Sequence, residues 1–524
     1  MMIFKSSSIF LFAIGKELLT ERNCDVAVVG SGFAGLAAAI EAANNLPPTA
    51  KVLVLEKMPS FGGNSVMNAG QIAAVGSKQQ QAAGIEDSVE LMMKDMLAAG
   101  VDLNHPNLLR RMIEDSNDVV EWTESELGVT YRDRVTQLGG HSVPRTLSTP
   151  NACGSDIIDP LLRRVKELPN VELIPNTAFE SFIMSEDGRT VEGIKVQNTR
   201  GSTQKERLIC EKGVILCSGG FSADVPFRSI QNPSFGADVM STNQPGATAE
   251  VMKEALKIGA MSVQLSRIQL GPWTSPDETG FGKAPFFCLG AGFPYGIIVD
   301  PFTSLRFVTE LGNRYERSMA ILKTIGHPVV CITDSDGAQH SLRKPLQDLE
   351  PTVKSFSNLD DLAKEHGMDP AVLKDTVRQH NEGVKNGKDD FGKPFRDDLT
   401  PIKTSPFYAT RLWPKVHHTM YVSFVCHAAC FFCRPLPVLT TLHHGPFALY
   451  PRGGLHINDD ARVMHVDGIP IGNLFAAGEV AGGVHGGDRL GSCATLDCIS
   501  FGRVAGRSAA LSKHHKKFEL LNLF

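Results

Sequence analysis

The 524-residue sequence contains no apolar run of the about 18 residues that a membrane-spanning helix requires. Its formal net charge of −5 gives no reason to expect nucleic acid or an anionic membrane as a partner. Eleven cysteines in a chain of this length are not the disulfide framework of a small secreted domain. A soluble intracellular protein, cytoplasmic or organellar, is therefore expected.

The two ends of the chain carry little information. Residues 1–21 are expected to be an extension, with two lysines and a short apolar run over residues 9–15. This is a weak targeting signal, because it lacks a clear small-residue cleavage site. Residues 514–524 are expected to be a basic tail.

The first strong signal is the segment "DVAVVGSGFAGLAAAIEAANNLPPTAKVLVLEK" at residues 25–57. Its apolar runs at 26–29 and 52–55 predict two buried parallel strands around an alanine-rich helix, a βαβ unit. Gly30, Gly32 and Gly35 form a G-x-G-x-x-G turn between the first strand and the helix. Glu56, 21 residues after Gly35, is placed to accept hydrogen bonds from a ribose diol. The pattern predicts a dinucleotide site.

FAD explains the glycine distribution better than NAD. After the turn, glycine clusters recur at 62–63, 219–220, 478 and 482–483, so one large ligand is contacted from distant segments. No second G-x-G-x-x-G unit is present for a dedicated NADH domain. Further strands are predicted at residues 171–176, 191–198, 213–220 and 472–480.

The predicted fold class is α/β, with a discontinuous Rossmann-like FAD-binding domain and an inserted α+β capping domain. The chain is too long for one simple core, and near residue 270 its composition changes to that of proline- and aromatic-rich loops. The FAD-binding domain is expected at 22–268 and 453–513, and the capping domain, which would carry the substrate site, at 269–420.

Several motifs resemble the soluble fumarate reductase and flavocytochrome c family of the fumarate reductase/succinate dehydrogenase flavoprotein superfamily. They are "GSGFAGLAAAIEA", "LEKMPSFGGNS", "CSGGFS", "RFVTELGNR", "HHTM" and "AAGEVAGGVHGGDRLGS". The resemblance implies that Arg314, eight residues after Arg306, is the proton donor. It also implies that His418 and Arg489 hold a substrate carboxylate. These three residues are the predicted catalytic set.

The resemblance also implies the residues that contact FAD. Membrane-bound relatives attach FAD through a histidine at the position of Ser65, so the cofactor is expected to be non-covalent. The candidate contacts are Gly30, Gly32, Phe33, Ala34, Gly35, Glu56, Lys57, Gly62, Gly63, Asn64, Ser65, Ala69, Gly70, Thr177, Ala178, Ser218, Gly219, Gly220, Gly478, Glu479, Gly491 and Leu496.

The implied activity is FAD-dependent reduction of a C=C bond conjugated to a carboxylate, nominally fumarate to succinate. Two departures from the family pattern matter. The family's second carboxylate-binding motif appears here as Gly271-Pro272-Trp273, and its proton-relay positions fall in residues 289–293, which contain no ionisable group. A mono-carboxylate enoate, such as urocanate or an aryl acrylate, would suit Trp273 and the aromatic pair Phe286-Phe287.

Other functions stay open on the sequence alone. A ketosteroid dehydrogenase or another FAD-dependent dehydrogenase needs a tyrosine-type proton acceptor, and the six tyrosines form no recognisable motif. A catalytically impaired flavin-binding homologue is a third possibility. The electron donor is expected to be a reduced flavin nucleotide, NADH or a partner reductase, because the sequence contains no CxxCH haem-attachment motif.

Residues 421–452 interrupt the family pattern between "HHTM" and "GGLHIND" and contain no acidic residue. The codons possible at both junctions permit in-frame splice sites, so the stretch is interpreted as a translated, unspliced intron of a eukaryotic gene. One alternative is a genuine surface loop. Another is an iron–sulfur site, because thiolates at radical-SAM spacing bind such clusters; its ligands would be Cys426, Cys430 and Cys433. No metal is expected.

Overall fold

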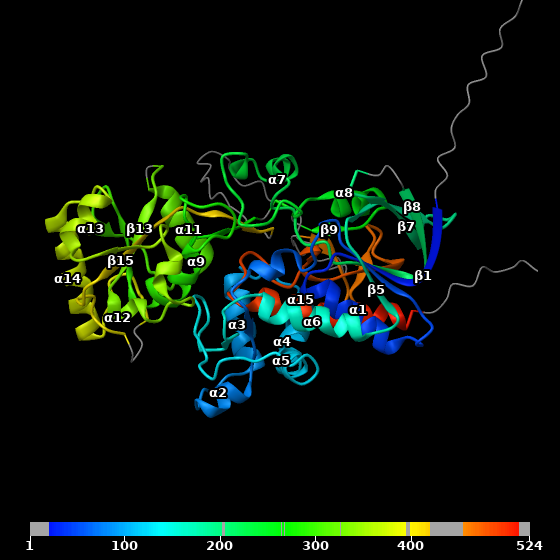
Figure 1. Cartoon of the computed structure of the whole chain (residues 1–524), viewed down its shortest axis with the longest axis horizontal. Coiled ribbons are helices and arrows are strands. Elements are labelled where there is room, and N and C mark those ends of the chain that lie inside the picture. The colour runs from blue at the N-terminus through cyan, green and yellow to red at the C-terminus, as the bar shows by residue number, and fades with distance from the viewer. Residues whose placement is uncertain are drawn as a thin grey trace, which may run out of the picture.

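The structure is a computed structural model, and it describes residues 20–201, 205–263, 265–266, 268–324, 326–394, 399–419 and 454–512. The anomalous stretch at 421–452, with its three cysteines, lies outside these residues, as do the tail at 514–524 and most of the N-terminal extension. Figure 1 shows two lobes arranged along the long axis of the molecule.

The larger lobe is built on an eight-stranded sheet with the order β18-β19-β8-β1-β2-β5, in which the β6–β7 hairpin pairs with β8. The central pairs are parallel: Val26 of β1 faces Val52 of β2 on one side and Gly213 of β8 on the other. Residues 26–29 are buried, as expected for a strand covered on both faces. The strands are β1 (Thr20–Val29), β2 (Val52–Leu55), β5 (Val171–Ile174), β6 (Thr177–Met184), β7 (Val191–Asn198), β8 (Lys205–Leu216), β18 (Arg462–Met464) and β19 (Pro470–Ala476).

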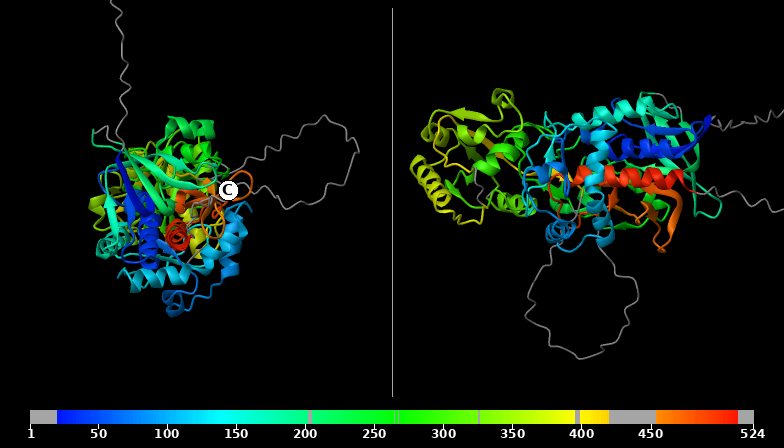
Figure 2. Two further views of the ribbon diagram at one scale, coloured as in Figure 1. Left: turned by 90° about the vertical axis from the view of Figure 1, so that its right-hand side faces the viewer. Right: turned by 90° about the horizontal axis from the view of Figure 1, so that it is seen from below.

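Helices surround this sheet, and two of them pack closely. A Cβ on Gly506 of α15 would lie 2.2 Å from the carbonyl oxygen of Ala38 in α1, so glycine permits the two helices to touch. Figure 2 shows α15 running along the long axis from the boundary between the lobes. The helices of this lobe are α1 (Phe33–Asn45), α2 (Lys78–Ala82), α3 (Val89–Ala99), α4 (Pro106–Glu114), α5 (Ser116–Ser125), α6 (Ser155–Glu167), α7 (Val225–Gln231), α8 (Glu250–Lys257) and α15 (Cys493–Ala510).

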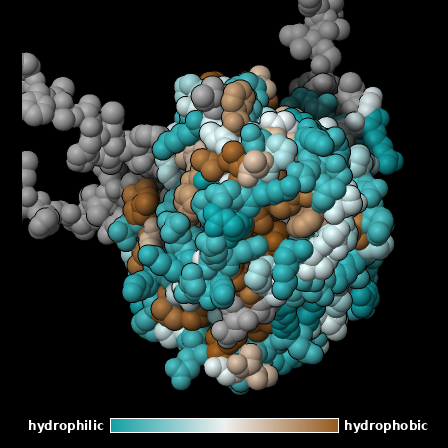
Figure 3. Space-filling model, turned by 90° about the vertical axis from the view of Figure 1, so that its left-hand side faces the viewer, coloured by the Kyte–Doolittle hydropathy of each residue, from teal (hydrophilic) through white to brown (hydrophobic). Residues whose placement is uncertain are grey.

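The smaller lobe, here called the cap, contains a five-stranded sheet with the order β12-β11-β13-β15-β14. Seen from the cap end, its surface is mainly hydrophilic with scattered hydrophobic patches (Figure 3). The strands are β11 (Ile297–Asp300), β12 (Leu305–Arg306), β13 (Val329–Thr333), β14 (Lys354–Phe356) and β15 (Phe407–Leu412). The helices are α9 (Ala284–Phe287), α10 (Phe293–Tyr295), α11 (Arg314–Lys323), α12 (Ser335–Ala338), α13 (Leu359–Glu365) and α14 (Pro370–Asn386).

The chain enters and leaves the cap through two strands that pair with each other. These are β10 (Gln269–Gly271) and β16 (Lys415–His418), which run antiparallel with Gln269 opposite His418. Two smaller sheets complete the larger lobe. They are formed by β3 (Gln71–Ala73) with β4 (Thr146–Ser148), and by β20 (Ala481–Gly482), β17 (Gly454–His456) and β9 (Ser262–Val263).

The predicted fold class is confirmed, since a parallel sheet core carries the glycine turn and a second α+β unit is inserted. All four of the further predicted strands overlap observed ones, β5, β7, β8 and β19. The strand β6 was not predicted, because it follows β5 after only two residues and the two read as one apolar segment. Among the described residues, every helix is too short or too polar to span a membrane.

His380, on α14, makes the stability of the cap depend on pH. The side chain is buried, and burial lowers its pKa to about 4. A histidine in the unfolded chain has a pKa near 6.5. Below that pH the unfolded chain therefore binds a proton that the folded chain does not bind. We expect the free energy of unfolding to fall as pH drops from about 6.5 to about 4, with His380 contributing up to about 3 kcal/mol.

Urea unfolding of the wild type and His380→Leu at pH 7 and pH 4.5 measures this contribution. The variant should lose less stability than the wild type between the two values. An identical loss in both proteins would show that His380 is not the group that titrates.

Candidate active site

A glycine-rich turn joins β1 to α1 at the carboxyl end of the large sheet. Gly30 has a φ of 108°, and a Cβ there would lie 2.3 Å from the carbonyl oxygen of Cys217. A Cβ on Gly35 would lie 1.9 Å from the carbonyl oxygen of Gly30. Only glycine fits either position, and the resulting turn places the N-terminus of α1, which has no side-chain cap, beside a cavity.

Glu56 lies at the end of β2 on the wall of the same cavity. Its carboxylate accepts hydrogen bonds from the hydroxyl of Ser31 at 2.6 Å and from the backbone N–H of Met58 at 2.9 Å. A carboxylate offers about four acceptor positions, so Glu56 keeps capacity for ligand hydroxyls. The neighbouring Lys57 pairs with Glu250 at 3.1 Å across the cavity mouth.

This first cavity has about 1020 Å³ of empty space, part of it open to solvent, and is reached by β1, β2, β6, the loop after β8 and the 310 turn Gly478–Val480. Predicted residues that line it are Gly30, Gly32, Phe33, Ala34, Glu56, Lys57, Gly63, Asn64, Ser65, Thr177, Ala178, Ser218, Gly219, Gly478 and Glu479. Residues that prediction missed come chiefly from 244–251, a segment with no motif of its own.

A second cavity, of about 870 Å³, adjoins the first and shares Asn64, Ser65, Glu479 and Cys498 with it. It lies between the two lobes, because its lining comes from both. The three predicted catalytic residues, Arg314, His418 and Arg489, all line it, as does Ala69.

The two arginines are tied together by a residue that the sequence did not single out. The amide oxygen of Gln269 accepts from Nη1 of Arg314 at 2.8 Å and from Nη2 of Arg489 at 3.2 Å. The amide nitrogen of Gln269 donates to the carboxylate of Asp488 and to the carbonyl of Arg489. Asp488 also accepts from the backbone N–H of Tyr315, at the start of α11. Gln269 thus links the cap helix to the loop 488–492.

Burial controls the electrostatics of this cluster. It lowers the pKa of both guanidinium groups, and the charge of Arg489 lowers the pKa of Arg314 further. Burial also lowers the pKa of His417 and His418 well below the usual value, so both rings are neutral at pH 7. A bound anion would be attracted by both positive charges and would reduce the repulsion between them.

Arg489 carries a buried donor that has no partner within the described part of the chain. Among the described residues, nothing accepts a hydrogen bond from Nε of Arg489. Such an atom costs free energy unless a ligand or solvent satisfies it. His418 lies on the same wall, with its Nδ1 3.7 Å from Oε1 of Glu479. The geometry therefore suits a carboxylate held by Arg489 and His418.

Part of the wall of the second cavity is apolar. Trp273, Phe281 and Leu289 line it, and the Arg314 guanidinium stacks 4.4 Å from the centre of the Trp273 ring. Lys415 of β16 donates to the carbonyls of Glu278 and Gly280, which fastens the loop that carries Phe281.

Phe286 and Phe287, predicted to face the substrate, are instead buried in the core of the cap. Phe281 takes the place expected of them, and Phe286 packs behind it with ring centres 5.8 Å apart. The short helix α9 turns both phenylalanines inward, which an aromatic pair in a loop could not reveal.

Comparison with known proteins assigns the chain to a family. The chain matches the FAD binding domain family over residues 25–421 and 434–495. This chain belongs to that family. The flavoprotein is 37% identical over 500 residues to the acrylate reductase flavoprotein subunit of Shewanella woodyi, with 93% of this chain and 91% of the relative covered. It is 33% identical to the urocanate reductase of Eggerthella lenta, with 93% and 75% covered.

A solved structure supports the same conclusion. The open conformation of a flavocytochrome c3 fumarate reductase superposes with a TM-score of 0.70 at 30% identity, covering 93% of this flavoprotein and 78% of that chain. The flavoprotein is therefore an FAD-dependent oxidoreductase of the group that acts on C=C bonds. The predicted family, enzyme class and cofactor are confirmed.

The residues present fit FAD. The glycine turn admits a pyrophosphate, Glu56 offers carboxylate oxygens, and the two cavities are contiguous through four shared lining residues. Six predicted contact residues line neither cavity: Gly35, Gly62, Gly70, Gly220, Gly491 and Leu496. They support the walls instead: Gly35 closes the turn, and Leu496 is fully buried in the core.

Substitution of Gly32 should weaken FAD binding much more than it weakens folding. Unlike Gly30, it has an ordinary φ of −72°, and the nearest atom to a Cβ is the Ser65 hydroxyl at 3.1 Å. We expect Gly32→Ala to fold with nearly normal stability but to lower FAD affinity at least about tenfold, because the methyl group enters the cavity. Gly30→Ala should instead lower the unfolding temperature.

FAD content by absorbance and thermal unfolding of the apoprotein measure the two effects. A Gly32→Ala protein that purifies with full FAD would contradict the placement of the pyrophosphate at this turn.

In the described residues, no group of three or more His, Cys, Asp and Glu side chains is arranged to hold a metal ion.

Proposed function

We propose that this flavoprotein reduces the C=C bond of an enoate that carries one carboxylate and an apolar or aromatic substituent. The observation that carries the proposal is the second cavity, which combines two arginines with an apolar surface formed by Trp273, Phe281 and Leu289. Acrylate and urocanate, named for two relatives, are enoates with a single carboxylate.

FAD, when bound, supplies a hydride for this reaction. The protein must bind and polarise the substrate and deliver one proton. Arg489 offers a charged fork and a free Nε donor to the carboxylate, and neutral His418 offers a ring nitrogen. Binding of the carboxylate by these donors draws electron density from the C=C bond, which makes the β-carbon a better hydride acceptor.

Arg314 is the proposed proton donor for the α-carbon. Arginine is normally a poor acid, with a pKa above about 12. Here burial and the positive charge of Arg489 lower the pKa of Arg314, which makes proton release easier at the moment of reaction. Gln269 and Trp273 fix its guanidinium from two sides.

The apolar wall disfavours a second carboxylate. Among the described lining residues, Arg314 and Arg489 are the only lysine or arginine side chains, and Gln269 holds the two together. A second carboxylate against Phe281 and Leu289 would be buried without a cation of its own, at a cost of several kcal/mol. Fumarate should therefore be a poor substrate.

A substrate panel tests the proposal. The purified holoenzyme is reduced with dithionite, which replaces the proposed donor (reduced flavin nucleotide, NADH or a partner reductase), and re-oxidation is followed with acrylate, cinnamate, urocanate and fumarate. We expect kcat/KM for at least one mono-carboxylate to exceed that for fumarate by about 10² or more. Re-oxidation by none of them would reject enoate reduction, and a preference for fumarate would reject the single-carboxylate assignment.

Leu289→Phe provides a matched control on the same wall. The larger side chain should lower kcat/KM for cinnamate and leave that for acrylate nearly unchanged, because acrylate does not reach the wall. Equal effects on both substrates would place Leu289 elsewhere relative to the substrate.

A further inference from the structure

Residues 137–146 form a loop of the larger lobe that contacts the chain next to each of the two arginines. A Cβ on Gly139 would lie 2.6 Å from the carbonyl of Gly312, just before Arg314. A Cβ on Gly140 would lie 2.5 Å from the side chain of Leu490, next to Arg489. The loop therefore touches the start of α11 and the loop 488–492 at once.

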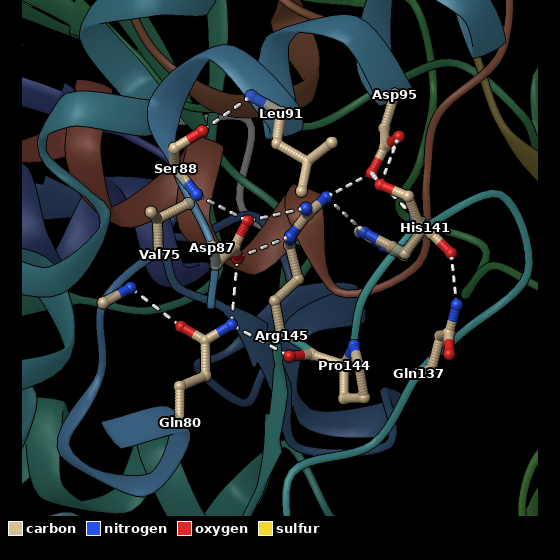
Figure 4. A network of polar contacts seen from close by, with 12 residues as sticks. Val75, Gln80, Asp87, Ser88, Leu91, Asp95, Gln137, His141, Pro144 and Arg145 are labelled. Atoms are coloured by element: carbon tan, nitrogen blue, oxygen red, sulfur yellow. Dashed lines mark hydrogen bonds and ion pairs between the residues drawn. The ribbon is translucent and has the colours of Figure 1, made fainter. Parts of the chain in front are cut away.

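The loop is anchored by a buried polar network, shown in Figure 4. The fully buried guanidinium of Arg145 pairs with Asp87 at 2.9 Å and with Asp95 at 2.6 Å. Asp95 also accepts from the backbone N–H and the hydroxyl of Ser142. These contacts tie the loop to α3 and to the segment before it.

Arg145 determines the tautomer of His141. Its Nη1 lies 3.3 Å from Nδ1 of His141, and a guanidinium only donates hydrogen bonds. Nδ1 must therefore be the acceptor, which leaves the proton on Nε2. That nitrogen lies 3.0 Å from the carbonyl oxygen of Gly491 and donates to it.

The bond to Gly491 acts on a strained part of the loop 488–492. Ser492, the next residue, has a φ of 64°, a left-handed conformation that costs free energy for a residue with a side chain. Its hydroxyl is held at 2.7 Å by the hydroxyl of Thr146, which directly follows Arg145 in the same anchored loop as His141. Without these two hydrogen bonds, the backbone between Arg489 and α15 should relax out of this strained conformation.

We propose that His141 is a positioning residue for substrate binding: through the Gly491 carbonyl it holds the loop 488–492, and thereby Arg489, in the geometry that receives the carboxylate. The inference rests on the proposed function, in which Arg489 binds the substrate carboxylate. His141 itself does not line the second cavity and does not touch the substrate.

The test compares three substitutions in the holoenzyme. His141→Phe fills the space but removes the donor, whereas His141→Gln keeps an N–H near the position of Nε2. We expect His141→Phe to raise KM for the enoate and the dissociation constant of its saturated product at least about tenfold, with a smaller change in kcat. His141→Gln should restore most of the binding. Thr146→Val, which is nearly isosteric, should weaken binding in the same direction.

The dissociation constant is read from the change in flavin absorbance on titration with the saturated carboxylate, so it needs no turnover. His380→Leu is the control, because His380 is equally buried but lies in the cap on α14. It should leave carboxylate affinity unchanged.

The outcomes separate the two proposals. If the wild type reduces no enoate, the proposed function fails. If the wild type is active and His141→Phe, or Thr146→Val where that protein does not fold, binds the carboxylate as tightly as the wild type, the role of His141 fails. Loss of binding in His141→Gln equal to that in His141→Phe would also overturn it, because the donated hydrogen bond would then be irrelevant.

Discussion

Arg314→Ala should lower kcat for enoate reduction by about 10³-fold and leave FAD bound. Loss of a positioned proton donor typically costs 10²- to 10⁴-fold. Arg314 contacts Gln269 and Trp273 in the second cavity and does not line the first. Single-turnover re-oxidation of the reduced enzyme by the best substrate of the panel measures the rate, and visible absorbance measures FAD content.

Lys323→Ala, at the exposed end of the same helix, controls for effects on α11. It should retain wild-type kinetics. An Arg314→Ala enzyme that keeps more than about a tenth of the wild-type rate would assign the proton to another group.

Arg489→Leu should lower kcat/KM by about 10²- to 10³-fold. Removal of one partner of a buried, hydrogen-bonded charge pair costs about 2–5 kcal/mol, and each 1.36 kcal/mol is tenfold in rate. The loss should fall on KM and on product affinity as well as on kcat, since the carboxylate is present before and after hydride transfer. Titration with the saturated carboxylate and steady-state kinetics separate these effects.

Arg489→Lys is the matched variant, because it keeps the charge but loses the planar fork. It should lie between the wild type and Arg489→Leu. Equal activity of the lysine variant and the wild type would show that charge alone holds the substrate, and unchanged product affinity in Arg489→Leu would remove the carboxylate from this end of the cavity.

The sequence predicted the parts of the site that local chemistry dictates. The turn at residues 30–35 could be read because only glycine fits its backbone at positions 30 and 35. Arg314, His418 and Arg489 were placed through the family resemblance, and the structure brings all three to one cavity. Their roles remain predictions until they are tested.

The rest depended on contacts between distant segments. Gln269 joins two arginines from 45 and 220 residues away, and an isolated glutamine carries no signal of such a role. His141 acts on Gly491, 350 residues away, for the same reason. Phe286 was predicted to face the substrate, but Phe281 lines the cavity instead. This difference depends on how a short helix orients its side chains, which no residue pattern in a proline-rich loop specifies.

The pairing of β10 with β16 has a mechanical consequence. If the cap rotates relative to the larger lobe, this two-stranded ribbon is the pivot, and atoms near a pivot move least. Gln269 and His418 face each other on it, so the carboxylate end of the substrate would keep its contacts during rotation. Leu289, which lies beyond the ribbon and beyond the loop that Lys415 fastens to it, would move farther, so that product leaves with its substituent end leading.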